Sequence, residues 1–112
     1  MKIAIPLQDG QLATHFGHCQ EFALFDVSDD AESVPAPETL AAPPHQPGLL
    51  PKWLDDHGAD VIIAGGMGKR AQSLFAQNGI ETVVGVKSRD PKTIISDYLK
   101  DSLSAGQNLC DH

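Results

Sequence analysis

Two short stretches of the sequence, residues 22–27 and 60–64, are apolar at nearly every position. A strand with one face in water alternates apolar and polar residues, whereas an unbroken apolar run is typical of a strand covered on both faces. Such a sheet needs helices on both of its sides. The two runs therefore predict a three-layer α/β/α domain.

The remaining strands are expected to flank these two runs. Strand-like segments are predicted at residues 2–6, 33–40 and 81–86. Because proline has no N–H to donate, Pro6 is expected to end regular pairing of the first segment, and Pro35 and Pro37 to confine the second to a sheet edge. Asp9 and Gly10 form a turn signal that indicates a tight hairpin after the first strand.

Three helices are expected from apolar residues at helical spacing and from residues that start or stop helices. The predicted ranges are 48–57, 69–78 and 90–103. Gly58 and Gly79 are placed where glycine commonly ends a helix. Asp90 followed by Pro91 is a strong helix start, since aspartate accepts backbone N–H groups and proline suits the first helical position.

The order of these elements predicts how the strands pair. Short connections between the first three strands favour an antiparallel meander, and the last two strands, each preceded by a helix, should be parallel to each other. We expect a ribonuclease H-like fold with a mixed five-stranded sheet in the order 3-2-1-4-5, strand 2 being antiparallel to the rest. The expected organisation is one domain over residues 1–106 and a short flexible tail over 107–112.

The connection between the first two strands carries the most distinctive side chains. His15, His18 and Cys19 lie within five residues of one another, and imidazole and thiolate groups are ligands for zinc, copper, nickel or iron. Loops held by a rigid scaffold often carry function. Alternatively, the histidines are turn residues with no role in binding. The sequence leaves open whether they bind a metal or not.

A glycine-rich turn follows the strand at residues 60–64 and opens the next helix. It reads Gly65, Gly66, Met67, Gly68 and is followed by two cations, Lys69 and Arg70. Backbone N–H groups at a helix N-terminus, together with positive charge, suit an anion. Alternatively, the glycines let the helix pack closely on the sheet, and Met67 is either core filler or a soft pocket wall.

Several of these features should meet at one edge of the sheet. Strands one and four are expected to be parallel neighbours, so the connections that leave their carboxyl ends lie side by side, where open α/β sheets bind ligands. His45, just ahead of the helix at 48–57, is expected at the same edge, although an isolated histidine there can simply be exposed. His57 is explained as a cation near a helix C-terminus and not as a ligand.

The two cysteines and the C-terminus leave further alternatives. Cys19 and Cys110 are far apart in sequence, and each is read as a free thiol or a metal ligand, not as half of a disulfide. Cys110 and His112 form a short Cys-x-His tail. That tail either folds over a metal or has no role in binding.

Composition narrows the class of partner. The formal net charge is −7, which argues against nucleic acid and anionic membranes because both attract a basic surface. No apolar run approaches the roughly 18 residues of a membrane span, and the first residues start a strand without the features of a signal peptide. We expect a cytoplasmic protein.

The motifs together resemble a known family. The N-terminal segment reads MKIAIPLQDGQLATHFGHCQEFALFDV, and a later segment reads DVIIAGGMGKRAQSLFAQNGIETVVG. The opening strand, the His15-Phe16-Gly17 motif, Phe22 at the start of the second strand and the strand–Gly-Gly-x-Gly–helix pattern resemble the dinitrogenase iron–molybdenum cofactor biosynthesis family. The Cys-x-His ending is similar to that of several small members, so the resemblance covers nearly the whole chain.

The resemblance implies a non-enzymatic carrier, or metallochaperone, for an anionic metal–sulfur cluster. The cargo would be an iron–sulfur cluster, an iron–molybdenum cofactor precursor or a molybdenum–copper sulfide, with client or cluster-assembly proteins as partners. His15 is the family-matched residue, and His18 and Cys19 extend its motif. The alternatives are a protein that binds a single zinc or copper ion through His15, His18 and Cys19, aided by Cys110 and His112, and a regulatory interaction domain.

Overall fold

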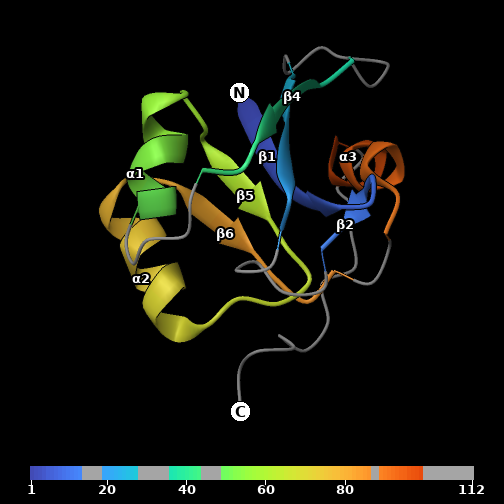
Figure 1. Cartoon of the computed structure of the whole chain (residues 1–112). Coiled ribbons are helices and arrows are strands. Elements are labelled where there is room, and N and C mark those ends of the chain that lie inside the picture. Colours follow the sequence, from blue (N-terminus) through green and yellow to red (C-terminus); the bar gives the residue numbers. More distant parts are fainter. Residues whose placement is uncertain (14–18, 28–35, 44–48, 87–88, 100–112) are drawn as a thin grey trace.

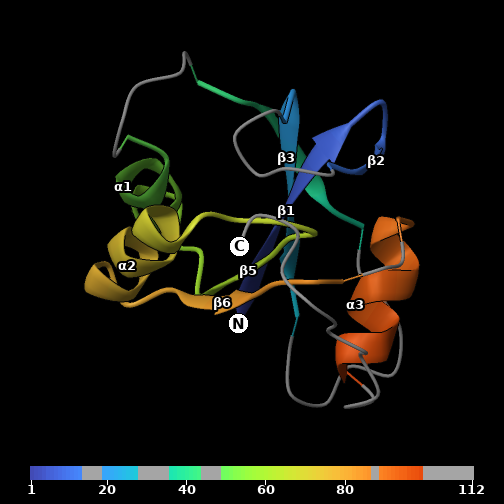
Figure 2. The ribbon, with the colours of Figure 1, turned by 90° about the horizontal axis from the view of Figure 1, so that it is seen from below.

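The computed structural model describes residues 1–13, 19–27, 36–43, 49–86 and 89–99. A twisted sheet lies between two helices on one face and one helix on the other (Figures 1 and 2). The helices are α1 (Leu49–Asp56), α2 (Lys69–Gln77) and α3 (Pro91–Leu99); α1 and α2 share a face. The strands are β1 (Lys2–Gln8), β2 (Gln11–Leu12), β3 (Glu21–Asp26), β4 (Glu38–Ala41), β5 (Val61–Ile63) and β6 (Glu81–Val83).

The sheet has the strand order β4-β3-β1-β5-β6. β3 is antiparallel to β1 and β4, while β1, β5 and β6 are parallel. This is the order and direction predicted for the five expected strands. The expectation of five strands was wrong, because β2 pairs with β1 as a sixth.

The sixth strand comes from the hairpin signal at Asp9 and Gly10. Gln8 pairs with Gln11 across the turn. Asp9 and Gly10 have φ angles of 56° and 79°, as in the type I′ turns that match the twist of a two-residue hairpin. The Asp-Gly pair supplies residues that tolerate this left-handed conformation.

Pro6 does not end β1, contrary to the sequence prediction. The strand continues to Gln8, and Pro6 pairs with Phe22 of β3. Asp60 N–H donates to the Lys2 carbonyl, so the backbone groups of even-numbered β1 residues face β5. The β1–β5 register ends at Ala4. The missing N–H of Pro6 therefore falls beyond that ladder, and the Pro6 carbonyl still accepts the Ala13 N–H at 2.9 Å, so the strand continues.

Alternating side chains of the central strands build two apolar clusters, one on each face. Ile3, Ile5 and Phe25 pack on one face with the α3 residues Ile94 and Ile95. The opposite cluster contains Ala4, Phe22 and Ile62 of the strands with Leu54 of α1 and Phe75 of α2. Burial on both faces explains the unbroken apolar runs, as the three-layer prediction required.

Glycines end α1 and α2 as predicted. Gly58 and Gly79 adopt left-handed φ angles of 83° and 74°. Each is followed by a residue whose N–H reaches back five positions: Ala59 donates to Leu54, and Ile80 to Phe75. This is the Schellman arrangement, which satisfies carbonyls at the end of a helix and turns the chain directly into the next strand.

Asp90 caps α3 as predicted. Its carboxylate accepts the Thr93 N–H at 3.2 Å and the Thr93 hydroxyl at 2.7 Å. The helix is described as far as Leu99, so the predicted end at residue 103 lies outside the described residues. In the part of the chain that the structure describes, no helix is long and apolar enough to cross a membrane.

The last three predicted strands also have different limits in the structure. The predicted strand at 33–40 is present as Glu38–Ala41, and residues 28–35 lie outside the described part. The strand predicted at 60–64 is Val61–Ile63, and the last strand ends at Val83, not at residue 86. Gly85 explains the second change, because its left-handed φ of 79° interrupts the extended backbone.

Candidate functional site

The carboxyl ends of β1 and β5 meet at one edge of the sheet, hereafter the carboxyl edge. Ile3 pairs with Val61 and Ala4 with Ile62 in parallel register. Beyond that register β1 turns away into β2, and the chain after β5 enters the glycine turn. Diverging connections between adjacent parallel strands are where open α/β sheets bind ligands.

Both flanks of segment 14–18 are tied to the end of β1. Ala13 N–H donates to the Pro6 carbonyl at 2.9 Å, and Gln20 N–H donates to the Leu7 carbonyl at 2.7 Å. The Gln20 side chain also accepts the Asp9 N–H at 3.2 Å. The described ends of this connection are therefore fixed at the carboxyl edge. His15 and His18 themselves lie outside the described residues.

Cys19 is the predicted metal ligand that the structure does describe. It is half-buried and packs against the apolar cluster that contains Phe22 and Met67. Leu50 and Trp53, which are partly buried, pack against the same cluster. Burial in these apolar surroundings raises the pKa of the thiol from 9.0 to about 11, and a backbone hydrogen bond lowers it by less. The thiol is therefore neutral at pH 7, and a metal must displace its proton to bind.

The raised pKa predicts the pH dependence of Cys19 chemistry. The test is the rate of iodoacetamide alkylation as a function of pH in a Cys110→Ser background. The midpoint of the rise in rate should lie at about pH 11 for the folded protein and at 9.0 in denaturing urea. Because the folded pKa is the higher, the thiol's contribution to stability is complete below 9.0 and is lost as the pH approaches 11. A folded-state midpoint near 9.0 would contradict the burial of this thiol.

The glycine turn is mostly buried. Gly65, Gly66 and Met67 are buried, whereas Gly68 is exposed. Met67 is only 1% exposed and belongs to the apolar cluster under α1 and α2, so of the two roles weighed for it the structure supports core filler. Its carbonyl accepts the Gln72 side-chain amide at 3.0 Å, which ties the turn to α2.

Gly68 begins α2 without the usual side-chain cap. It is the N-cap residue, with φ −67° and ψ 157°, and it makes no side-chain cap hydrogen bond because glycine has no side chain to offer one. A Cβ at this position would meet no atom within 4 Å. Close packing therefore does not explain this glycine, and neither does backbone strain. Its effect is to leave the positive end of α2 open.

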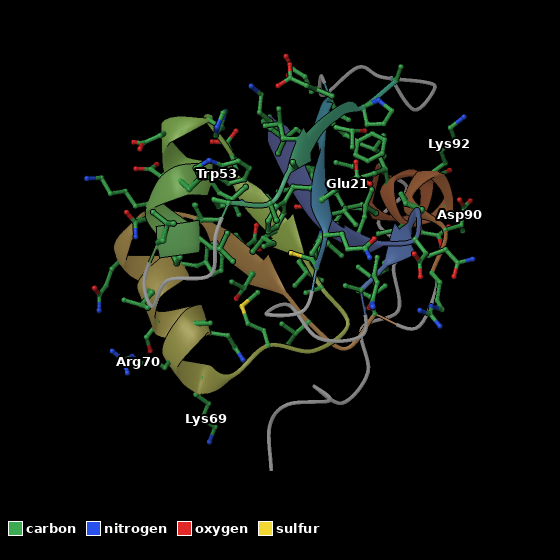
Figure 3. The ribbon with its side chains drawn as sticks, viewed as in Figure 1. Glu21, Trp53, Lys69, Arg70, Asp90 and Lys92 are labelled. Atoms are coloured by element: carbon green, nitrogen blue, oxygen red, sulfur yellow. The ribbon has the colours of Figure 1, made fainter. Side chains whose placement is uncertain are left out.

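Lys69 and Arg70 stand in the first turn of α2, and both are exposed. Their side chains extend outward from the helix in Figure 3. Their positive charges therefore raise the electrostatic potential around the start of α2. Because the charges are exposed, salt weakens this effect.

Of the remaining histidines and the C-terminal tail, the structure describes only His57. His57 packs its ring against Trp53 with 4.6 Å between centroids, at the end of α1 that is remote from the glycine turn. Its carbonyl accepts the Lys2 ammonium at 3.1 Å, so a lysine contacts this helix C-terminus. His45, Cys110 and His112 lie outside the described residues.

The predicted ligands are only partly brought together. Among residues 1–13, 19–27, 36–43, 49–86 and 89–99, no three His, Cys, Asp or Glu side chains are grouped to hold a metal ion. Gly85 was not singled out from the sequence, yet its N–H donates to the Gly65 carbonyl at 3.0 Å. The glycine inside the predicted strand ETVVGV was the available signal, since glycine within a strand often marks a bulge.

Comparison with known proteins identifies the family of the chain. The sequence matches the family described as dinitrogenase iron-molybdenum cofactor over residues 1–101. It is 31% identical over 84 residues to an uncharacterized protein of Methanocaldococcus jannaschii, MJ0580, covering 72% of this chain and 71% of that protein.

Two solved structures have a similar fold. The crystal structure of PH0822 has a TM-score of 0.82 and 31% identity, covering 94% of each chain. The apo form of the orange protein from Desulfovibrio gigas has a TM-score of 0.72 and 20% identity, covering 96% of this chain and 93% of that one. The chain belongs to the dinitrogenase iron–molybdenum cofactor family, which connects it with cofactor biosynthesis or metal-cluster binding.

Proposed function

We propose that this protein binds an anionic metal–sulfur cluster at the carboxyl edge and carries it without catalysing a reaction. The cargo would be an iron–sulfur cluster or a molybdenum-containing cluster of the kind that precedes the iron–molybdenum cofactor. We further propose that the fold is of the ribonuclease H-like type, with its switch point serving as the cargo site.

The uncapped start of α2 is the observation that carries this proposal. A serine or aspartate at position 68 would satisfy an N–H of the helix, because a Cβ there meets open space. The chain instead has glycine, which forgoes a stabilising cap and keeps the positive end of the helix accessible. An exposed helix N-terminus at the end of a parallel strand is suited to an anion.

Cys19 is the described side chain best suited to touch a metal in such a cargo. It is a soft donor half-buried beside the same edge, and a bound metal favours the thiolate despite the raised pKa. His15 and His18 are proposed as imidazole donors from the adjoining segment. A small number of protein ligands is expected of a carrier, since the cargo has to be released.

Anaerobic reconstitution tests the proposal. The protein should acquire visible absorption after incubation with ferrous iron, sulfide and molybdate, followed by desalting. Trp53 is the only tryptophan and packs against the cluster that includes Cys19, so its fluorescence should fall as cargo binds. His15→Ala should reduce the bound metal at least tenfold.

His57→Ala is the matched control, because it removes a histidine from the far end of α1. It should leave metal loading unchanged. Failure to form an absorbing species, or equal loading of the His15→Ala variant, would refute the carrier proposal. Stoichiometric zinc or cuprous ion binding without sulfide, lost in Cys19→Ser, would instead establish the single-ion alternative.

A further inference from the structure

The peptide group between Gly65 and Gly66 is flipped relative to the regular alternation of the strand that precedes it. At the end of β5, both backbone groups of Ala64 face the β6 side: its N–H donates to the Val83 carbonyl at 2.8 Å, and its carbonyl accepts the Val86 N–H at 3.5 Å. Regular alternation would direct the next residue, Gly65, toward β1. Instead the Gly65 carbonyl accepts the Gly85 N–H at 3.0 Å, on the β6 side.

Gly85 allows this reversed orientation of the peptide. It is buried and has φ 79°, a conformation in which an L side chain is strained by about 1–2 kcal/mol. That conformation turns the chain directly after the N–H that bonds Gly65, so that the next N–H, of Val86, lies 3.5 Å from the Ala64 carbonyl. Gly65 and Gly85 are thus two glycines on adjacent strand ends joined by one hydrogen bond.

The flipped peptide determines the direction of the Gly66 N–H. No described peptide bond is cis, so the N–H of Gly66 points opposite to the carbonyl of Gly65, away from β6 and toward the side where β1 lies. Gly66 is buried, and within the described part of the chain no acceptor is bonded to its N–H. The Pro6 carbonyl at the end of β1 is already occupied by Ala13 N–H.

We infer that the Gly66 N–H is a ligand-binding donor, and that Gly85 is the positioning residue that aims it at the carboxyl edge. Buried backbone N–H groups are almost always paired, so one beside a strand end that has no partner among the described residues marks a place for an acceptor atom. The ligand class is an anion that presents an oxo or sulfido group. This inference rests on the proposed function and names the donor that the cargo would meet.

The test uses tetrathiomolybdate, a diamagnetic anionic metal sulfide, as the probe for amide NMR of the ¹⁵N-labelled protein. Saturating probe should move the Gly66 amide proton downfield by at least 0.5 ppm, roughly the change expected for a new charge-assisted hydrogen bond. Hydrogen exchange at Gly66 should slow at least tenfold, while exchange at Gly85, already bonded to Gly65, should change little.

Gly85→Ala should abolish the Gly66 shift and weaken probe binding at least fivefold. Gly79→Ala is the matched control, because it strains another left-handed glycine, with φ 74°, at the opposite end of α2. It should keep the shift. If Gly85→Ala does not fold, the exchange measurement on the unsubstituted protein still decides the question.

The outcomes separate this inference from the proposed function. Probe binding that perturbs Cys19 but leaves the shift and exchange of Gly66 unchanged would overturn the inference and leave the carrier proposal standing. Absence of binding by tetrathiomolybdate and by the reconstituted cluster alike would overturn both. A Gly66 amide that already exchanges as slowly as Gly85 in the unliganded protein would show that it has a partner and would also refute the inference.

Discussion

Gly68→Asp should make the protein more stable and a poorer binder of its cargo. The aspartate would accept an N–H of α2 and place negative charge at the positive end of the helix, which together stabilise the fold by about 0.5–1 kcal/mol. The same carboxylate would repel an anionic cluster. We expect cluster affinity to fall at least tenfold, or about 1.4 kcal/mol, as measured by titration of Trp53 fluorescence.

Gly68→Asn separates capping from charge, because it offers a similar oxygen without the negative charge. It should give a similar gain in the urea midpoint and lose much less affinity than Gly68→Asp. The added side chain has room in both variants. Equal affinity of the aspartate and asparagine variants would contradict an anionic cargo at the start of α2.

Phe75→Ala should destabilise the fold by about 3–5 kcal/mol, the range expected for deleting a buried aromatic side chain. Phe75 is 0% exposed and joins α2 to the apolar cluster on that face of the sheet. Domains of this kind are stable by about 5–15 kcal/mol, so the loss would leave the variant partly unfolded at modest urea concentration. Trp53 fluorescence during urea denaturation measures the change.

Ser73→Ala provides the comparison on the same helix. Ser73 is exposed, and surface substitutions of this kind usually change stability by less than about 0.5 kcal/mol. If Phe75→Ala cost as little as Ser73→Ala, the packing of α2 on the sheet would be wrong, and the placement of the glycine turn would be wrong with it.

Much of the fold could be predicted because the decisive signals are local. The apolar runs at β3 and β5, the glycines after α1 and α2 and the Asp90 cap each act within a few residues, and each is present in the structure. Pro6 could not be judged locally. Its effect depends on where the β1–β5 ladder ends, which is a property of the neighbouring strand.

The candidate site was predictable in position but not in detail. Chain order alone places the connections after β1 and β5 at one edge, which the parallel register confirms. The burial of Cys19 and Met67 depends on packing against α1 and α2, which spacing does not reveal. A glycine inside a predicted strand indicated an irregularity at Gly85, but its bond to Gly65, twenty positions earlier, depends on how β5 and β6 pair and could not be found locally.

The most direct measurement is an anomalous-diffraction map at the molybdenum and iron edges, from crystals of the protein reconstituted and kept without air. The proposed function predicts a metal peak at the carboxyl edge, beside Cys19 and the start of α2. A peak at the opposite rim, near Asp60 and Glu81, or fully loaded crystals with no peak at the carboxyl edge, would contradict it.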